Sequence, residues 1–153
     1  DNLLVVDTPD ALLISSMEGA KKINSCIENI KKIKPSLVEE NRKVYRPWGW
    51  YDSIDNGDSH QVKRIHVYPG QKLSLQRHQH RAERWVVIQG IATVTLDNDE
   101  YDFKVGDVVQ INIMQIHSLE NKTTKNLEII EVQLGNYLGE DDIERFENAR
   151  VRV

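Results

Sequence analysis

The sequence has a single cysteine, Cys26, so no disulfide can form within the chain. It also has no apolar run long enough to cross a bilayer. The first residues, DNLLVVDTPDALLIS, lack the basic start and small-residue cleavage site of a secretory signal. These absences predict a cytoplasmic protein with no membrane partner. Cys26 falls on an expected helix, where it is interpreted as a small packed side chain.

Basic residues are not in excess, because 20 Lys and Arg stand against 24 Asp and Glu and give a net charge of −4. Without a basic surface, the chain is not expected to bind nucleic acid. The length of 153 residues, with 39% hydrophobic and 29% charged residues, is ordinary for a globular chain. One domain with a small appendage is therefore predicted.

The appendage is expected within residues 1–43. Two short strands, residues 3–6 and 11–14, surround a turn at Thr8-Pro9-Asp10. Ser15 and Glu18 have the spacing of a capping box that opens a helix. One apolar stripe follows, and the helix ends before Pro35; the stripe consists of Met17, Ala20, Ile23, Ile27, Ile30 and Ile33. The stripe predicts a packing face, and residues 36–46 are interpreted as a linker.

From Pro47 onward the pattern is that of short strands separated by Gly, Asn and Asp turns. The expected strand segments are HQVKRIHVYPG, KLSLQRH, ERWVVIQG, IATVTLD, YDFKVGDVVQI, HSLEN and NLEIIEVQL. Their number and spacing predict a sandwich or a jelly-roll barrel. A short acidic helix, GEDDIERFE, is expected after the last strand.

The segment between Gly70 and Gly90 carries the residues with most chemical meaning. Strand alternation places Ser74, Gln76, His78 and His80 on one face. Glu83 on the next strand can converge on Gln76 and His78. With the later His117, these residues can form a set of four metal ligands. Two other interpretations stay open at this point. The histidines could be half exposed without a metal, and Glu83 could pair with a nearby arginine at the surface.

The spacing of these residues resembles the first cupin motif, with Gln76 where many cupins have a histidine. Gly106, His117 and Asn121 resemble the second motif. Three longer segments are similar to the C-terminal domain of the bifunctional mannose-1-phosphate guanylyltransferase/mannose-6-phosphate isomerase family: YRPWGWYDSID, QVKRIHVYPGQKLSLQRHQHRAERW and LEIIEVQLGNYLGEDDIERFE.

The resemblance implies a mainly β fold, a cupin jelly-roll (double-stranded β-helix) barrel over residues 44–153. Residues 1–43 resemble the last strands and tail of that family's nucleotidyltransferase domain. The Gly-rich loop and catalytic half of that domain are not in this sequence. The guanylyltransferase reaction is therefore not expected of it.

The resemblance also implies metal-dependent interconversion of mannose 6-phosphate and fructose 6-phosphate, on the route to GDP-mannose. The implied ligands of a divalent ion, zinc first and cobalt or manganese as alternatives, are Gln76, His78, Glu83 and His117. His80 is the second choice in place of Gln76. The phosphate is expected on a cation, and the candidates are Arg81, Lys63, Arg64 and Arg145. Lys63 and Arg64 alternate along a strand, so only one points inward. A homodimer is expected.

Three departures from the family pattern touch this region. Arg84 stands where the family has a histidine, Asn112 and Met114 stand where it has proline and glycine, and of the residues after Glu147 only Arg152 is kept. Methionine is strained at positive φ, which raises the question whether His117 keeps its place. The alternatives are a catalytically inactive cupin that binds a sugar phosphate or nucleotide sugar, and a purely structural dimerisation module. A cupin oxygenase ranks lower, since it needs the histidine that Gln76 replaces.

Overall fold

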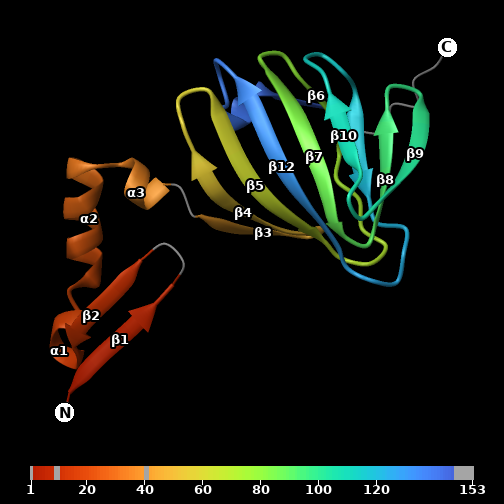
Figure 1. Ribbon diagram of the computed structural model, residues 1–153. Coiled ribbons are helices and arrows are strands. Elements are labelled where there is room, and N and C mark those ends of the chain that lie inside the picture. Colours follow the sequence, from red (N-terminus) through yellow and green to blue (C-terminus); the bar gives the residue numbers. More distant parts are fainter. Residues whose placement is uncertain (1, 9–10, 40–41, 147–153) are drawn as a thin grey trace. The chain divides into compact units, whose positions relative to one another are not determined.

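The chain forms two compact units, Asp1–Val44 and Tyr45–Val153. This computed structural model describes residues 2–8, 11–39 and 42–146 (Figure 1). Two features of the sequence analysis lie outside the described residues. They are the expected turn residues Pro9 and Asp10 and the residues after Glu147 that depart from the family pattern.

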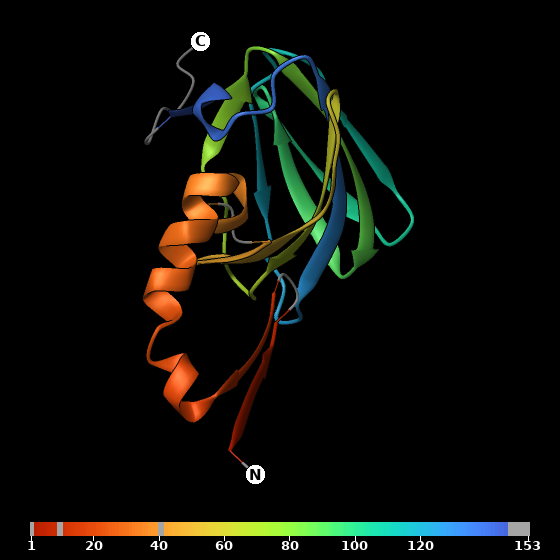
Figure 2. The same ribbon diagram turned by 90° about the vertical axis from the view of Figure 1, so that its left-hand side faces the viewer.

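The first unit opens with the predicted antiparallel hairpin. Strands β1 (Leu3–Asp7) and β2 (Leu12–Ser16) pair from Leu3 opposite Ser16 to Asp7 opposite Leu12. The expected single helix is divided into α1 (Met17–Ala20) and α2 (Ile23–Ile33), as Figure 2 shows from a second side. The capping-box assignment was wrong by one residue. Ser16, not Ser15, caps α1, because its Oγ accepts from the Gly19 backbone N–H at 2.9 Å.

The apolar stripe of α2 is confirmed as one face of a helix, but no residue of α1 or α2 is buried. Ile23, Ile27 and Ile30 are each more than a third exposed, and Ile33 is 85% exposed. Cys26 is also exposed, so the interpretation as a packed side chain was wrong. Helical periodicity predicts which residues share a face, and it does not predict whether a neighbour within the chain covers that face.

The linker interpretation of residues 36–46 was also wrong. The segment contains α3 (Ser36–Glu39) and the strand β3 (Lys43–Arg46), which is an edge strand of the main sheet. A four-residue edge strand shows too little alternation to be recognised from sequence. Its pairing is supplied by the neighbouring strand β4 (Gly49–Asn56), which the sequence had not marked as a strand.

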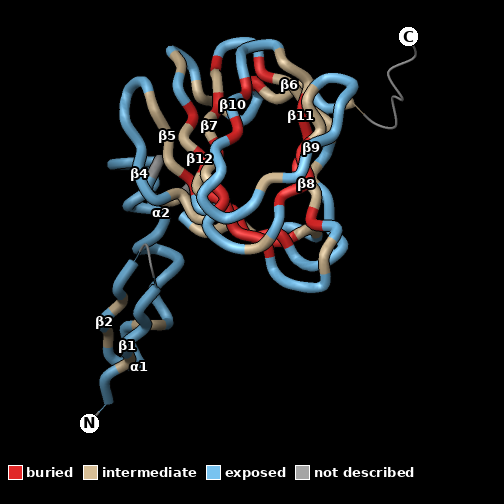
Figure 3. Tube along the Cα trace, turned by 45° about the vertical axis from the view of Figure 1, so that its right-hand side comes forward, coloured by how far each residue is buried: buried red, intermediate tan, exposed pale blue. Residues whose placement is uncertain are grey.

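The second unit is built from two antiparallel sheets that face each other and curve into a barrel (Figures 1 and 3). One sheet has the order β10-β7-β12-β5-β4-β3, and the other has the order β13-β6-β11-β8-β9. The remaining bounds are β5 His60–Val67, β6 Leu75–His78, β7 Arg81–Gln89, β8 Ile91–Leu96, β9 Asp99–Lys104, β10 Val108–Ile111, β11 His117–Glu120, β12 Leu127–Gly135 and β13 Ile143–Phe146.

Alternation along the strands decides which side chains enter the barrel. In β7, buried and half-buried residues alternate from Arg81 to Val87. Figure 3 shows the buried positions in red along the strands of the barrel. The expected acidic helix after the last long strand was wrong. Only Glu140–Asp142 form a 3₁₀ turn, η1, and the next residues form the edge strand β13, which pairs with β6.

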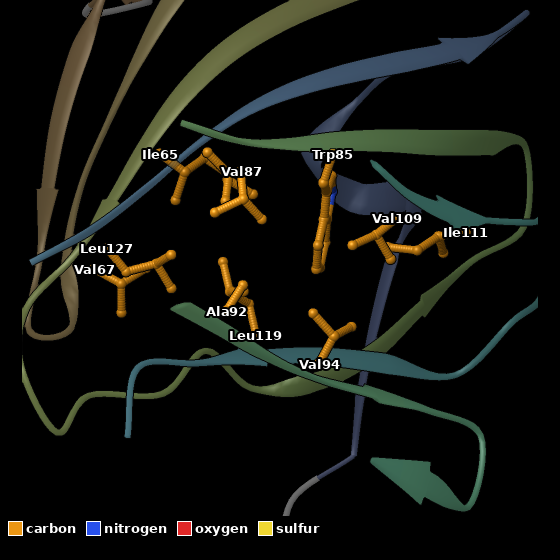
Figure 4. Packing of buried hydrophobic residues seen from close by; sticks show 11 residues of the cluster. Ile65, Val67, Trp85, Val87, Ala92, Val94, Val109, Ile111, Leu119 and Leu127 are labelled. Atoms are coloured by element: carbon orange, nitrogen blue, oxygen red, sulfur yellow. The ribbon is translucent and has the colours of Figure 1, made fainter. Parts of the chain in front are cut away.

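The apolar core fills one end of the barrel (Figure 4). It takes residues from both sheets, all at most 5% exposed: Ile65, Val67, Trp85, Val87, Ala92, Val94, Val109, Ile111, Leu119, Leu127 and Ile129. Gly90 lets two strands approach closely there. Its φ is 82°, and a Cβ at this position would lie 2.7 Å from the carbonyl oxygen of Asn126.

Farther along the same strands the inward positions become polar. Glu131 on β12 lies between Lys63 on β5 and Trp85 on β7. Two residues farther along β12, Gln133 lies opposite Glu83 on β7. All five are buried. The barrel therefore has an apolar end and a polar end. No helix in the described part of the chain is long and apolar enough to span a membrane.

The core assignment predicts that substitution of two isoleucines by alanine lowers the free energy of unfolding by different amounts. Ile111 is fully buried and Ile113 is 50% exposed. Ile111→Ala is expected to lower the free energy of unfolding by about 2–5 kcal/mol, because it leaves a cavity. Ile113→Ala should stay within about 0.5 kcal/mol. Chemical denaturation measures the free energy of unfolding of both variants. Equal losses would contradict the assignment of Ile111 to the core.

Candidate metal centre and adjoining cavity

Three buried side chains from three strands converge at the polar end of the barrel. His78 ends β6, Glu83 lies on β7 and His117 begins β11. One ligand atom from each lies within 4.8 Å of the others. Each residue is at most 1% exposed. The structure thus brings together three of the four residues that the sequence predicted as metal ligands.

The contacts within this cluster are close but are not ordinary hydrogen bonds. His78 Nε2 lies 3.0 Å from one Glu83 oxygen, and His117 Nε2 lies 3.7 Å from the other. Both ring nitrogens are buried without a hydrogen-bond partner among the described residues, as is His78 Nδ1. Buried nitrogens are normally satisfied. Nitrogens that point toward a shared carboxylate without bonding to it fit a cation between them.

The tautomer of His117 also suits a ligand. Its Nδ1 lies 2.9 Å from the carbonyl oxygen of Gln115, which can only accept, so Nδ1 carries the proton. Nε2 then presents a lone pair to the cluster. Burial lowers the pKa of His117, although the Glu83 carboxylate opposes that effect. The ring is therefore neutral near pH 7, the form that binds a metal.

Glu83 is held as a carboxylate. Burial alone would raise its pKa, but His78, His117 and Arg81 lower it by more, so the pKa lies below the ordinary value. Arg81 Nε donates to one oxygen at 3.2 Å, and Trp85 Nε1 donates to the other at 3.0 Å. These donors fix the orientation of the carboxylate.

Gln76 and His80 were the alternatives for the fourth ligand. Gln76 on β6 lies opposite His117 in the strand register and lines the adjacent cavity together with Glu83. His80 lies outside the cluster. Its side chain is 58% exposed, and Nδ1 contacts Asp142 Oδ1 at 2.7 Å. Gln76 is therefore the better placed of the two.

An open cavity of about 600 Å³, partly continuous with solvent, lies beside the cluster. Fifteen residues line it: Arg46, Trp48, Tyr51, Lys63, Ile65, Leu73, Ser74, Gln76, Arg81, Glu83, Glu131, Gln133, Glu140, Ile143 and Arg145. Three of the predicted phosphate-binding cations, Lys63, Arg81 and Arg145, are among them.

The alternation of Lys63 and Arg64 places Lys63 inside the barrel. Lys63 points inward, is 5% exposed and donates to Glu140 Oε1 at 2.7 Å. Arg64 points outward and pairs with Glu128, so it is not a cavity cation. Glu128 also contacts His66 Nδ1 at 2.9 Å, and the His66 ring stacks on Trp50. His66 thus packs on the outer side of the sheet and does not enter the cavity.

Glu131 is a cavity acid that the sequence analysis missed. Its oxygens accept from Trp85 Nε1 at 3.1 Å and from Gln133 Nε2 at 2.9 Å. Burial and the nearby Glu83 charge raise its pKa to about 8. The alternation of Ile129, Glu131 and Gln133 along one strand was the signal that could have revealed it, since all three face inward.

The departures from the family pattern leave the cluster intact. Arg84 lies between the inward positions of β7 and donates to the carbonyls of Glu83 and Ile111, so it does not enter the cavity. Met114 keeps the left-handed backbone, with φ 66°. Its N–H donates to the His78 carbonyl at 2.7 Å. His117 is therefore not displaced.

A small double-stranded β-helix barrel with a buried His–Glu–His cluster beside a cation-lined cavity defines a cupin. Solved structures support this fold. A Klebsiella pneumoniae protein described as having a double-stranded β-helix domain matches with TM-score 0.61 and 21% identity over 69% of this chain and 90% of that one. A Lactobacillus farciminis oxalate decarboxylase matches with TM-score 0.59 and 21% identity over 67% of this chain and 32% of that one. The predicted cupin fold is confirmed.

The family model described as mannose-6-phosphate isomerase C-terminal matches residues 34–148, and the chain belongs to this family. A Pseudomonas syringae relative called alginate biosynthesis protein AlgA is 45% identical over 97% of this chain and 31% of its own length. The Escherichia coli mannose-1-phosphate guanylyltransferase is 45% identical over 99% of this chain and 32% of its own. The chain thus spans about a third of the length of these curated relatives.

The Met114 turn generates a stability prediction. Left-handed backbone costs a non-glycine residue about 1–2 kcal/mol, and glycine avoids most of that cost. Met114→Gly is expected to raise the free energy of unfolding by up to about 1 kcal/mol after the entropy of glycine is counted. Asn112→Gly, in the same turn but without positive φ, should lower it. Denaturant titration measures the free energy of unfolding of both variants. A lower value for Met114→Gly than for the wild type would contradict backbone strain at Met114.

Glu131 generates a pH prediction for the metal-free chain. Its pKa is raised from 4.5 to about 8 in the folded state, so the folded chain keeps a proton that the unfolded chain releases between these values. Its contribution to stability is present below pH 4.5 and is lost as pH rises through about 8. Glu131→Gln should remove that loss in denaturation curves recorded with chelator.

Glu128→Gln is the matched control. Burial opposes the effect, but His66 and Arg64 hold the pKa of Glu128 below its ordinary value. Its contribution is therefore lost only as pH falls into the acid range. The pH dependence between about 5 and 8 should survive in this variant. Identical curves for wild type and Glu131→Gln would contradict the raised pKa.

Proposed function

We propose that the chain interconverts mannose 6-phosphate and fructose 6-phosphate in the supply of GDP-mannose for polysaccharide synthesis. The single observation that carries this proposal is the buried His78–Glu83–His117 cluster, which adjoins a cavity lined with cations in a chain of this family. The names of the relatives place them in alginate and xanthan biosynthesis and in guanylyl transfer to mannose 1-phosphate.

The donor set fits a divalent ion. His78, Glu83 and His117 offer two imidazoles and a carboxylate, and Gln76, which lies opposite His117 in the strand register, offers an amide oxygen. Imidazole and carboxylate ligands suit zinc, and cobalt and manganese also accept them. When bound, the ion would supply Lewis-acid polarisation of the sugar carbonyl and its neighbouring hydroxyl.

The substrate class follows from the charges around the cavity. Lys63, Arg81 and Arg145 line it, and their positive charge favours a phosphate dianion. The aromatic rings of Trp48 and Tyr51 add apolar wall on which a sugar ring can pack. We therefore assign the sugar phosphate to this cavity.

Isomerisation needs a group that moves a proton between C1 and C2. Glu131 lines the cavity beside Glu83, and its carboxyl group can take up and release a proton there. Trp85 and Gln133 hold both of its oxygens. We propose Glu131 as the acid–base residue. Glu131→Gln should then retain substrate binding and lose turnover.

We also propose that residues 1–43 are the end of a nucleotidyltransferase domain and that residues 44–153 are the isomerase domain. The family model begins at residue 34, whereas the relatives match over 97–100% of this chain, so the first unit also has counterparts in them. Its exposed isoleucine face on α2 is the surface expected of an element that packs on the rest of such a domain.

Two substitutions test the function. His78→Ala and Glu83→Ala each remove a ligand and should lower metal affinity and turnover by at least about 100-fold, since losing only a supporting partner of a ligand costs 10–100-fold. His60→Ala is the control, because His60 pairs with Asp55 at the surface. Elemental analysis and a coupled fructose 6-phosphate assay measure both quantities.

The outcomes separate the competing functions. Metal lost together with turnover in the two ligand variants, but kept in His60→Ala, is the expected result. Unchanged metal content in His78→Ala would refute the ligand assignment. Wild-type protein that holds metal and sugar phosphate without turnover would instead be a binding cupin. His80→Ala should retain metal, since His80 is engaged by Asp142 outside the cluster.

A further inference from the structure

The open side of the barrel is bordered by the edge strands of the two sheets. β3 ends the six-stranded sheet, and β13 ends the five-stranded sheet. Each carries an arginine that lines the cavity, Arg46 on β3 and Arg145 on β13. Residues far apart in the sequence thus place two guanidinium groups around one cavity.

Arg145 is directed into the cavity by the strand register. It lies opposite Gln76, and Gln76 lies opposite His117. Directly opposed residues of antiparallel strands share a face, so these three side chains belong to the inner face of the sheet. Neighbouring Glu144 has the other orientation and pairs with Arg77 Nε at 2.7 Å.

The four cavity cations differ in what they already bind. Lys63 pairs with Glu140 at 2.7 Å, and Arg81 pairs with Glu83 at 3.2 Å. Neither Arg46 nor Arg145 forms an ion pair with any acidic residue in the described part of the chain. Arg46 lies 6.0 Å from the centre of the Tyr51 ring. Arg145 acts on Glu140 only through its field, which contributes to the lowered pKa of that carboxyl.

We propose that Arg46 and Arg145 together hold the phosphate of the substrate across the open side of the barrel, and that they select phosphorylated over unphosphorylated sugars. Guanidinium groups bind phosphate through paired N–H donors. Lys63 and Arg81 then act as positioning residues that hold Glu140 and Glu83. The sugar end of the ligand is left to face Gln76 and Glu83. This inference rests on the proposed sugar-phosphate function.

Calorimetric titration with mannose 6-phosphate, mannose and inorganic phosphate tests the assignment. Arg46→Gln and Arg145→Gln should each weaken mannose 6-phosphate binding about tenfold or more, the size expected for a lost charged hydrogen bond. Binding of mannose and metal content should stay unchanged. In the coupled assay the same variants should raise KM and leave kcat nearly unchanged.

Arg77→Gln is the matched control, since it removes an arginine of β6 that pairs with Glu144 instead of lining the cavity. It should bind mannose 6-phosphate like the wild type. The proposal is overturned if both cavity variants keep wild-type affinity, if Arg77→Gln loses as much, or if the wild type binds mannose as tightly as mannose 6-phosphate. Because binding is measured without turnover, the phosphate site can be tested even in a chain that lacks isomerase activity.

Discussion

The polar end of the barrel depends on one buried carboxylate. Glu83 is almost fully removed from water, a position that costs free energy unless the charge is compensated. Arg81, Trp85, His78 and His117 surround it, and each comes from a different inward position of the wall. Arg81 and Trp85 donate to the carboxylate, while the imidazole nitrogens that face it have no hydrogen-bond partner among the described residues. A divalent ion is the partner that would satisfy these groups together.

The barrel makes this arrangement possible by changing the character of its strands along their length. β7 and β12 each carry apolar side chains inward at one end and polar ones at the other. Trp85 lies at the change, with its ring in the apolar core and its Nε1 shared between Glu83 and Glu131. Rigid strands, rather than loops, therefore position the donors, which favours the constant geometry that catalysis needs. The edge strands β3 and β13 add the charges around the open side.

Much of this could be predicted from the sequence, and the failures have physical causes. Strand alternation together with the resemblance to the cupin motifs predicted that His78, Glu83 and His117 would lie together. Gln76 was ranked ahead of His80 as the fourth ligand, but the contact that holds His80 outside the cluster could not be predicted, because Asp142 reaches His80 from a distant segment. Arg46 was missed because a short edge strand has no readable period. The exchange at Met114 left open whether His117 keeps its place, and the structure answers that it does, since the turn has a positive φ at Met114 and His117 remains in the cluster. The exposed isoleucine face of α2 shows another limit of prediction from sequence. Helical periodicity identifies which residues share a face, but it does not identify which residues pack against that face.

The central claim is that the cluster holds one divalent ion and that isomerisation depends on it. The most direct test strips the purified chain with chelator and adds back zinc, cobalt or manganese in measured amounts while turnover of mannose 6-phosphate is followed. The stripped chain should be inactive, and activity should return in proportion to the added ion until each chain holds one. Turnover that survives complete stripping, or uptake of one ion per chain with no return of turnover, would contradict the claim.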